Sequence, residues 1–195
     1  MNTEQTTAKR HGPSRITMVI CLALILGAAL VIARSLKFKS QVDVTLPAVL
    51  WEGGEAVAAS TTLHVHGELV KQWGQDDSFT GYFELENQPF TSEESNQVWL
   101  TMAHEGGGLN RGLLEYGKFP AHTLFGELYT DREYERFFLF PFEQVPGKVD
   151  GTVSYQPDTS VYVAPAASLD EAKALLESYD LMESHGLLMP DGSLR

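Results

Sequence analysis

The chain reads TTLHVHGEL over residues 61–69 and SFTGYFEL over residues 78–85, and both segments alternate between apolar and polar side chains. Side chains two positions apart in a strand point to the same face of a sheet, so each segment has one apolar and one polar face. Asp76 and Asp77 indicate a turn between them. The pattern predicts an antiparallel hairpin with one buried face.

Further short apolar segments recur along the chain at intervals of roughly ten residues. They lie at residues 42–46, 98–102, 114–116, 124–129, 136–142, 149–155 and 161–163. Residues 50–60, rich in glycine and alanine, are predicted as a loop. About eight short strands in this order favour a mainly β fold, either an antiparallel β-sandwich or a partly open barrel.

The segment 136–142 is almost continuously aromatic, which predicts a strand that is covered on both faces or that lies at a contact surface. Together with Trp51, Trp73 and Trp99 it offers a candidate surface for carbohydrate or protein. Burial in the core is the commoner fate of such aromatic side chains.

One helix is predicted near the C-terminus, over residues 168–185. Ser168 and Glu171 form a capping box, in which their side chains satisfy free backbone amides at the start of a helix. Apolar residues then recur at helical spacing, and Gly186 is a natural terminator. The helix is expected to cover an open end of the β-domain, with docking on a partner as the alternative, and residues 187–195 are expected to form a tail.

The N-terminal part contains an uncharged apolar run over residues 16–33, bounded by Arg15 and Arg34. Eighteen residues in a helix span about 27 Å, close to the hydrocarbon core of about 30 Å. The run predicts a single-pass transmembrane helix that contains Cys21, with a cleaved signal peptide as the alternative. The predicted organisation is a disordered cytoplasmic tail (1–15), the helix (16–33), a juxtamembrane linker (34–40) and a β-rich soluble domain (41–186).

Charge is distributed unevenly along the chain. The segment up to Lys39 holds six Lys or Arg and one Glu, a net charge of +5. The remainder holds eight basic and 25 acidic residues, a net charge of −17, which gives −12 for the whole chain. Such a domain is repelled by nucleic acids and by anionic lipid head groups, so nucleic-acid binding is excluded as a function.

Neither flanking charge nor cysteine content determines the orientation in the membrane. Three basic residues precede the run and three follow it, so the positive-inside bias is balanced. No cysteine follows Cys21, so the soluble domain has no disulfide, no cysteine metal ligand and no thiol nucleophile. This composition suits a domain that folds outside the cytoplasm without oxidation.

Several segments together carry a resemblance. They are the anchor, Val42-Asp43-Val44-Thr45-Leu46, the strand that ends at Gly67, Asp77-Ser78-Phe79-Thr80-Gly81-Tyr82-Phe83, and Val163-Ala164-Pro165-Ala166 before Asp170-Glu171-Ala172. In these segments the chain resembles an uncharacterised family of small single-pass membrane-anchored proteins of Gram-positive bacteria. The resemblance implies a β-rich domain displayed outside the cell membrane, and it brings no catalytic residues.

The sharpest chemical signal is the pair His64 and His66. Two residues apart on a strand, both imidazoles point the same way and are able to share a metal ion, with His104, Glu105 or His122 as further ligands. The spacing of a cupin-like metal barrel is absent, because Val70 and Lys71 stand where its carboxylate is expected. Two ligands do not make a closed site, so the sequence alone favours a solvent-facing histidine pair, no metal and no cofactor.

A glycine-rich segment, residues 104–111, suggests a lid or a backbone anion site. It lacks the lysine and the following hydroxyl of a phosphate-binding loop, so a plain loop is favoured. No Gly-x-Ser-x-Gly motif is present. The sequence therefore predicts a protein that is not an enzyme and that acts by binding or scaffolding at the cell envelope. The alternatives are a metal-dependent enzyme using His64 and His66, and an accessory subunit of a larger membrane complex.

Overall fold

The computed structural model describes residues 15–118, 121–146 and 153–187, without the side chains of residues 118, 121 and 122. The chain divides into two compact units, Met1–Leu36 and Lys37–Arg195. Most of the two predicted tails, at residues 1–14 and 188–195, lies outside the described residues.

The first unit contains a single described helix, α1 (Arg15–Ser35), whose 21 residues include none that is buried. At 1.5 Å per residue it is about 31 Å long, and it is apolar enough to cross a membrane. Only Leu36 separates α1 from the first strand, which begins at Lys37. The predicted juxtamembrane linker 34–40 is therefore wrong, because its residues belong to the end of the helix and the start of the strand.

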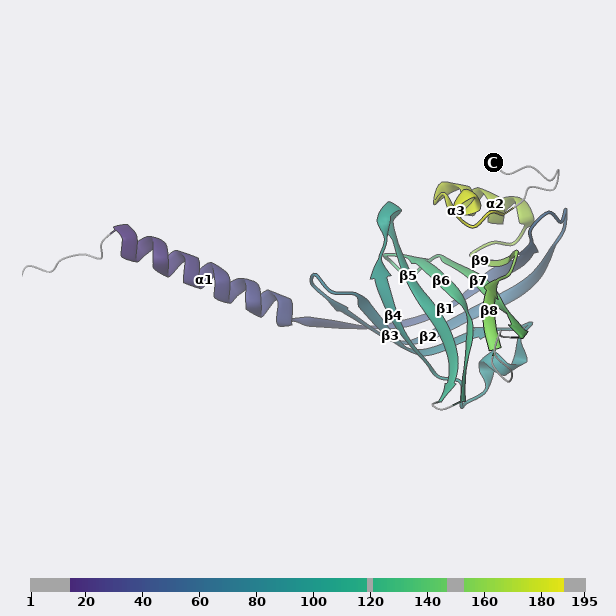
Figure 1. Cartoon of the computed structure of the whole chain (residues 1–195), viewed down its shortest axis with the longest axis horizontal. Coiled ribbons are helices and arrows are strands. Elements are labelled where there is room, and N and C mark those ends of the chain that lie inside the picture. Colours follow the sequence, from purple (N-terminus) through teal and green to yellow (C-terminus); the bar gives the residue numbers. More distant parts are fainter. Residues whose placement is uncertain (1–14, 119–120, 147–152, 188–195) are drawn as a thin grey trace, which may run out of the picture. The chain divides into compact units, whose positions relative to one another are not determined.

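The second unit is built mainly of antiparallel strands (Figure 1). Within the described part of the chain they are β1 (Lys37–Glu52), β2 (Ala58–Gln72), β3 (Asp77–Leu85), β4 (Val98–His104), β5 (Leu109–Lys118), β6 (Ala121–Asp131), β7 (Phe137–Pro146), β8 (Val153–Pro157) and β9 (Ser160–Ala164). The predicted hairpin is confirmed as β2 and β3. The predicted loop 50–60 is wrong at both ends, because β1 continues to Glu52 and β2 begins at Ala58.

Eight of these strands close into a barrel. Each strand from β1 to β7 pairs with the next, and β9 pairs with both β7 and β1. Strand β8 pairs with the second half of β7, from Phe142 to Pro146, and is not part of the ring. The predicted sandwich is wrong, and so is the partly open barrel, because Val163 pairs with Val49 on one side and with Phe138 on the other. This contact leaves no gap between the first and last strands of the ring.

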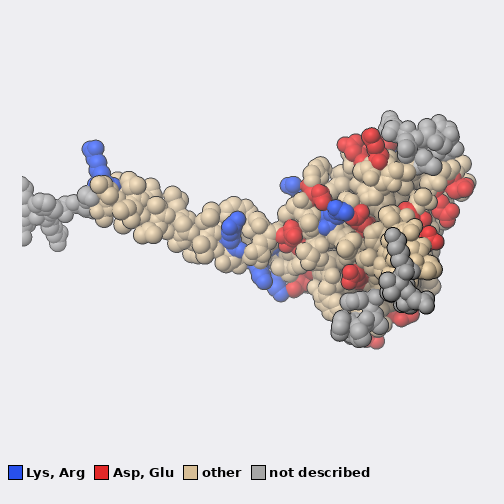
Figure 2. All heavy atoms as spheres, viewed as in Figure 1, with Lys and Arg blue, Asp and Glu red and all other residues tan. Residues whose placement is uncertain are grey.

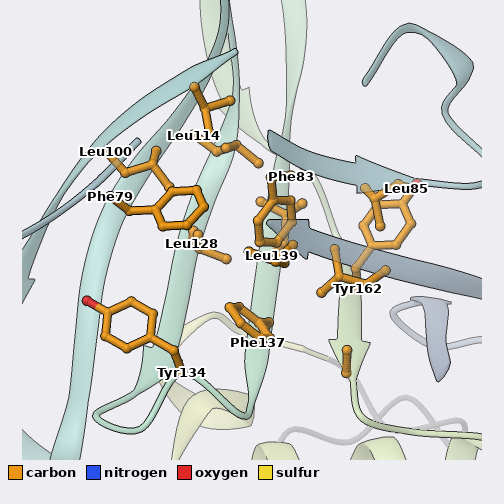
Figure 3. Packing of buried hydrophobic residues seen from close by; sticks show 14 of the residues in the cluster. Phe79, Phe83, Leu85, Leu100, Leu114, Leu128, Tyr134, Phe137, Leu139 and Tyr162 are labelled. Carbon is orange, nitrogen blue, oxygen red and sulfur yellow. The ribbon is translucent and has the colours of Figure 1, made fainter. Parts of the chain in front are cut away.

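The interior of the barrel is filled by its own side chains. Phe83, Phe137 and Leu139 point into one core, which also contains residues of β2, β4, β5 and β9 (Figure 3). A cavity among these side chains measures about 10 Å³, at the lower limit of what one water molecule needs. An eight-stranded barrel is just wide enough for side chains to fill it. The larger depressions among the described residues lie on the walls and at the ends of the barrel.

A second core lies between the outer wall and the C-terminal helices, α2 (Leu169–Ser178) and α3 (Leu181–Ser184). The capping box is confirmed: Ser168 Oγ accepts from the amide of Glu171, whose carboxylate accepts from the amide of Ala167. The single helix predicted over residues 168–185 is wrong, because Asp180 adopts a left-handed conformation (φ 56°) and separates α2 from α3.

Some of the aromatic residues lie in one of the two cores, and others are exposed. Phe137 faces the barrel interior and Phe138 faces the C-terminal helices, so the prediction that this strand is covered on both faces is confirmed. Trp51 is fully buried in the outer core, where its Nε1 donates to the carbonyl of Glu55 (2.9 Å). Trp73 and Trp99, in contrast, are more than half exposed.

Two glycines allow β2 and β3 to approach each other closely. Gly67 and Gly81 are direct cross-strand partners. A Cβ on Gly81 would lie 2.2 Å from the carbonyl oxygen of His66 and 2.6 Å from the Cα of Gly67. The ring of Phe79 covers the pair from inside, 2.9 Å from where either Cβ would lie, so the space on that side is already filled. This pair fixes the wall that carries His64 and His66.

We expect Gly81→Ala to destabilise the barrel by at least about 1–3 kcal/mol, because the added methyl group overlaps backbone atoms. Thermal and urea unfolding in detergent micelles, followed by circular dichroism, measures the loss. Gly106→Ala is the matched control: its Cβ meets nothing within 4 Å, so the change should stay within about 0.5 kcal/mol. Equal stability of the two variants would contradict the close approach.

Alkaline pH should unfold the domain. Burial raises the pKa of Tyr116 well above its ordinary value, and burial together with the Asp77 carboxylate raises the pKa of Tyr134. Above about pH 10 the unfolded chain loses tyrosine protons that the folded chain keeps, so the free energy of unfolding falls as the pH rises. Urea titrations between pH 8 and pH 12 should show constant stability up to about pH 10 and a steady decrease above it.

Tyr116→Phe should make this decrease shallower by up to about 1.4 kcal/mol per pH unit, because it removes one of the groups that titrate only in the unfolded chain. A decrease that is unchanged in this variant would contradict the assignment.

Candidate metal site on the outer wall of the barrel

His64 and His66 lie on β2 and face away from the barrel core. Their neighbours Leu63 and Val65 are buried inside, so strand alternation directs both imidazoles outward. The flanking strands supply polar partners: Glu84 of β3 is directly opposite His64, and Asp43 of β1 is directly opposite His66. Three adjacent strands thus bring two imidazoles and two carboxylates to one patch of the wall.

His64 lies between the two carboxylates. Its Nδ1 is 3.4 Å from Glu84 Oε2, and its Nε2 is 3.3 Å from Asp43 Oδ1. When the ring proton is on Nε2, that nitrogen donates to Asp43 and the lone pair of Nδ1 faces the Glu84 carboxylate. Two electron-rich atoms in such contact repel each other unless a proton or a metal cation lies between them. A proton on Nδ1 and a metal ion between Nδ1 and Glu84 would each remove this repulsion.

His66 completes the group. Its ring lies 4.7 Å from the ring of His64 and stacks on Tyr82, with the ring centroids 4.9 Å apart. Its Nδ1 is buried and has no hydrogen-bond partner among the described residues. A buried nitrogen without a partner carries a desolvation cost of about 1–3 kcal/mol, which a bound cation would remove.

The distances suit a metal ion closely but not completely. One ligand atom each from His64, His66 and Glu84 lies within 4.8 Å of the others. Bonds of 2.0–2.1 Å in a tetrahedral site place ligand atoms about 3.3 Å apart. The 3.4 Å between His64 and Glu84 already meets this requirement. The three ligand atoms as a group lie within 4.8 Å of one another, so they would have to draw closer together around a bound ion.

Two of the other predicted ligands, His104 and Glu105, do not reach this patch. His104 lies at the end of β4, where its Nδ1 contacts Asn110 (2.7 Å) and its Nε2 lies 3.8 Å from Asp77. Asp77 and Glu84 are at opposite ends of β3, about 23 Å apart along the strand. Glu105 pairs with Arg111 (3.6 Å). The side chain of His122 lies outside the described residues.

The glycine-rich segment is a turn between two strands. It contains a short 3-10 turn, η2 (Gly106–Gly108), with positive φ at Gly107 and Gly108, and it leads into β5 rather than into a helix. An anion site at a helix N-terminus is therefore ruled out for this segment.

Glu84 and Asp43 were not predicted from the sequence as partners of the histidines. The strand register could have identified Glu84, because Glu84 is the cross-strand partner of His64 in the β2–β3 hairpin. The sequence places the turn at Asp76 and Asp77, but the chain turns at Gly74, where φ is 70°. Centring the hairpin on this glycine gives the correct cross-strand partners.

Comparison of the chain with protein families, with curated proteins and with solved structures finds no match. The assignment of a function therefore depends on the geometry of the patch and on the N-terminal helix.

Proposed function

We propose that this protein is anchored in the cell membrane by α1 as a single-pass protein, that its barrel lies outside the cytoplasm, and that the barrel binds a divalent transition metal at the cell envelope. The observation that carries the metal assignment is the convergence of His64, His66 and Glu84 on one patch, with ligand atoms within 4.8 Å. The resemblance to small anchored proteins of Gram-positive bacteria is consistent with this proposal.

Zinc is the metal that we expect. Imidazole is a borderline-soft ligand and carboxylate is a hard ligand, and zinc accepts both. Zinc sites often combine two histidines with one glutamate. Asp43 then has a supporting role: it accepts from Nε2 of His64 and so directs Nδ1 toward the metal. Carboxylates commonly orient zinc-bound histidines in this way.

A metal-dependent enzyme is the second candidate. Three protein ligands leave one coordination position open for water or substrate. A groove lined by Thr62, Glu86, Pro89 and Ser92 begins beside His64 and Glu84 and would give a small substrate access to that position. Binding remains the first proposal, because the patch lies on the outer wall rather than in a deep cleft, and all three ligands are partly exposed.

The purified full chain should bind one zinc ion per molecule in isothermal titration and in elemental analysis. His66→Ala should abolish stoichiometric binding, because it leaves only two ligands. His104→Ala, which removes a histidine at the far end of the barrel, should leave the stoichiometry unchanged. Circular dichroism checks that both variants keep the fold. Binding that survives in His66→Ala, or a wild-type chain that binds no zinc, would contradict the assignment.

Asp43→Asn separates the supporting role from direct ligation. As a group that only orients His64, Asp43 should contribute about 10–100-fold to affinity and nothing to stoichiometry. An unchanged affinity would instead show that Asp43 takes no part in the site.

A single added cysteine tests on which side of the membrane the barrel lies. Ser154 on β8 is exposed, whereas Ser160 is only 6% exposed and is a poor labelling position. The native Cys21 lies within α1, so the unmodified chain is the background control. Ser154→Cys should react with a membrane-impermeant thiol reagent on intact cells. Reaction only after lysis would contradict the proposed orientation.

A further inference from the structure

The end of the barrel where β1 begins carries an open depression of about 440 Å³. Strands β1 to β4 and the turn after β6 contribute its walls, namely Phe38, Lys71, Gln72, Trp73, Gly74, Asp77, His104 and Arg132. We call this surface the β1 end. It is remote from the histidine patch, since Asp77 and Glu84 are at opposite ends of β3.

Two large apolar side chains at the β1 end lack cover. Phe38 is 61% exposed and Trp73 is 56% exposed, and both line the same depression. Phe38 is directly opposite Lys71 in the β1–β2 ladder, two residues before Trp73. An exposed aromatic pair beside a lysine resembles the interfacial belts of membrane proteins, where tryptophan rings lie at the level of the lipid head groups.

Charge at the β1 end differs from that of the rest of the domain. Four of the ten Lys and Arg residues from Lys37 onward gather there: Lys37, Lys39, Lys71 and Arg132. Glu68 is paired with Lys39 (2.8 Å), and Asp77 is buried and accepts from Tyr134 (3.1 Å).

Glu105, which follows His104, pairs with Arg111 (3.6 Å). The other exposed acids at this end, Asp76, Glu133 and Glu135, leave the local charge close to balance. Elsewhere acidic side chains are spread over the visible surface of the domain (Figure 2). The β1 end therefore avoids the repulsion from head groups that the net charge of −17 after Lys39 imposes on the rest of the domain.

Covalent connectivity keeps this end close to the anchor. Leu36 is the one residue between α1 and β1, and an extended chain covers at most about 3.6 Å per residue. Phe38 is thus within about 11 Å of the end of α1. Trp73 follows Gln72, the cross-strand partner of Lys37, so it is within about 16 Å. A helix that spans the hydrocarbon core ends where the head-group region begins.

We propose that the β1 end docks on the membrane that α1 spans, with Phe38 and Trp73 inserted among the lipid head groups and with Arg132 directed at lipid phosphates. Lys71, whose Nζ donates to the carbonyl oxygen of Arg132 (2.6 Å), adds positive charge beside it. The inference rests on the anchoring proposed above and is independent of the metal site. Docking gives the tethered barrel two attachments to the bilayer, the helix and the aromatic pair. The histidine patch then lies near the other end of β3, away from the docked end.

Tryptophan fluorescence tests the docking. The full chain is reconstituted in vesicles of phosphatidylcholine and phosphatidylglycerol whose acyl chains carry bromine, a short-range quencher. Trp73→Phe should lose the quenching that the wild-type chain shows. Trp99→Phe is the matched control, because Trp99 is 58% exposed, lies on the outer wall of β4 and should contribute no quenched emission. Trp51 is buried and adds a constant background.

The outcomes separate docking from anchoring. Equal quenching in Trp73→Phe and Trp99→Phe overturns the docking, because Trp73 then lies away from the lipid. An aqueous quencher would show whether Trp73 instead faces water or is covered by a second protein molecule; neither result restores the docking. Sedimentation of the vesicles after an alkaline wash tests the anchor independently. Loss of the chain from the washed vesicles overturns both proposals, whereas retention without Trp73 quenching overturns the docking alone.

Discussion

The pairing of β9 with both β1 and β7 closes the barrel, and the rest of the structure depends on that closure. The five residues of β9 are all buried, and β9 lies between β1 and β7. Closure gives β9 a partner on both edges, and each strand of the ring divides its side chains between an inner and an outer face. The inner face is filled by packed side chains, and the candidate site lies on the outer wall.

The same closure explains how three strands build one polar patch. His64 and His66 project outward because Leu63 and Val65 project inward, and the flanking strands place Glu84 and Asp43 beside them. The Gly67–Gly81 pair keeps β2 and β3 close at this point. A histidine pair that the sequence favours as solvent-facing thereby acquires carboxylates on both sides, which is the physical basis of the proposed zinc site.

Local patterns in the sequence predicted the local structure well. The alternation around Leu63 and Phe83 gave the hairpin, the phenylalanine-rich strand proved covered on both faces, and Ser168 caps its helix as expected. Non-local features were not predictable in this way. The contact of Val163 with Val49 joins residues more than a hundred positions apart, and nothing in either segment specifies its partner. The cross-strand partners of His64 required the correct turn, which lies at Gly74.

Net charge was informative for the whole domain and not for each of its surfaces. The strong excess of acidic residues opposes binding to nucleic acid, yet the β1 end gathers basic and aromatic side chains. Such differences become visible only when the strands bring distant residues together.

Anomalous diffraction at the zinc absorption edge, from crystals of the protein grown with zinc, would locate a bound metal. Zinc at the histidine patch should give one strong peak on the outer wall, bonded to nitrogen atoms of His64 and His66 and to a carboxylate oxygen of Glu84 at about 2.0–2.2 Å. No peak at this position, with His64 held between Asp43 and Glu84 and His66 stacked on Tyr82, would contradict the proposed zinc site.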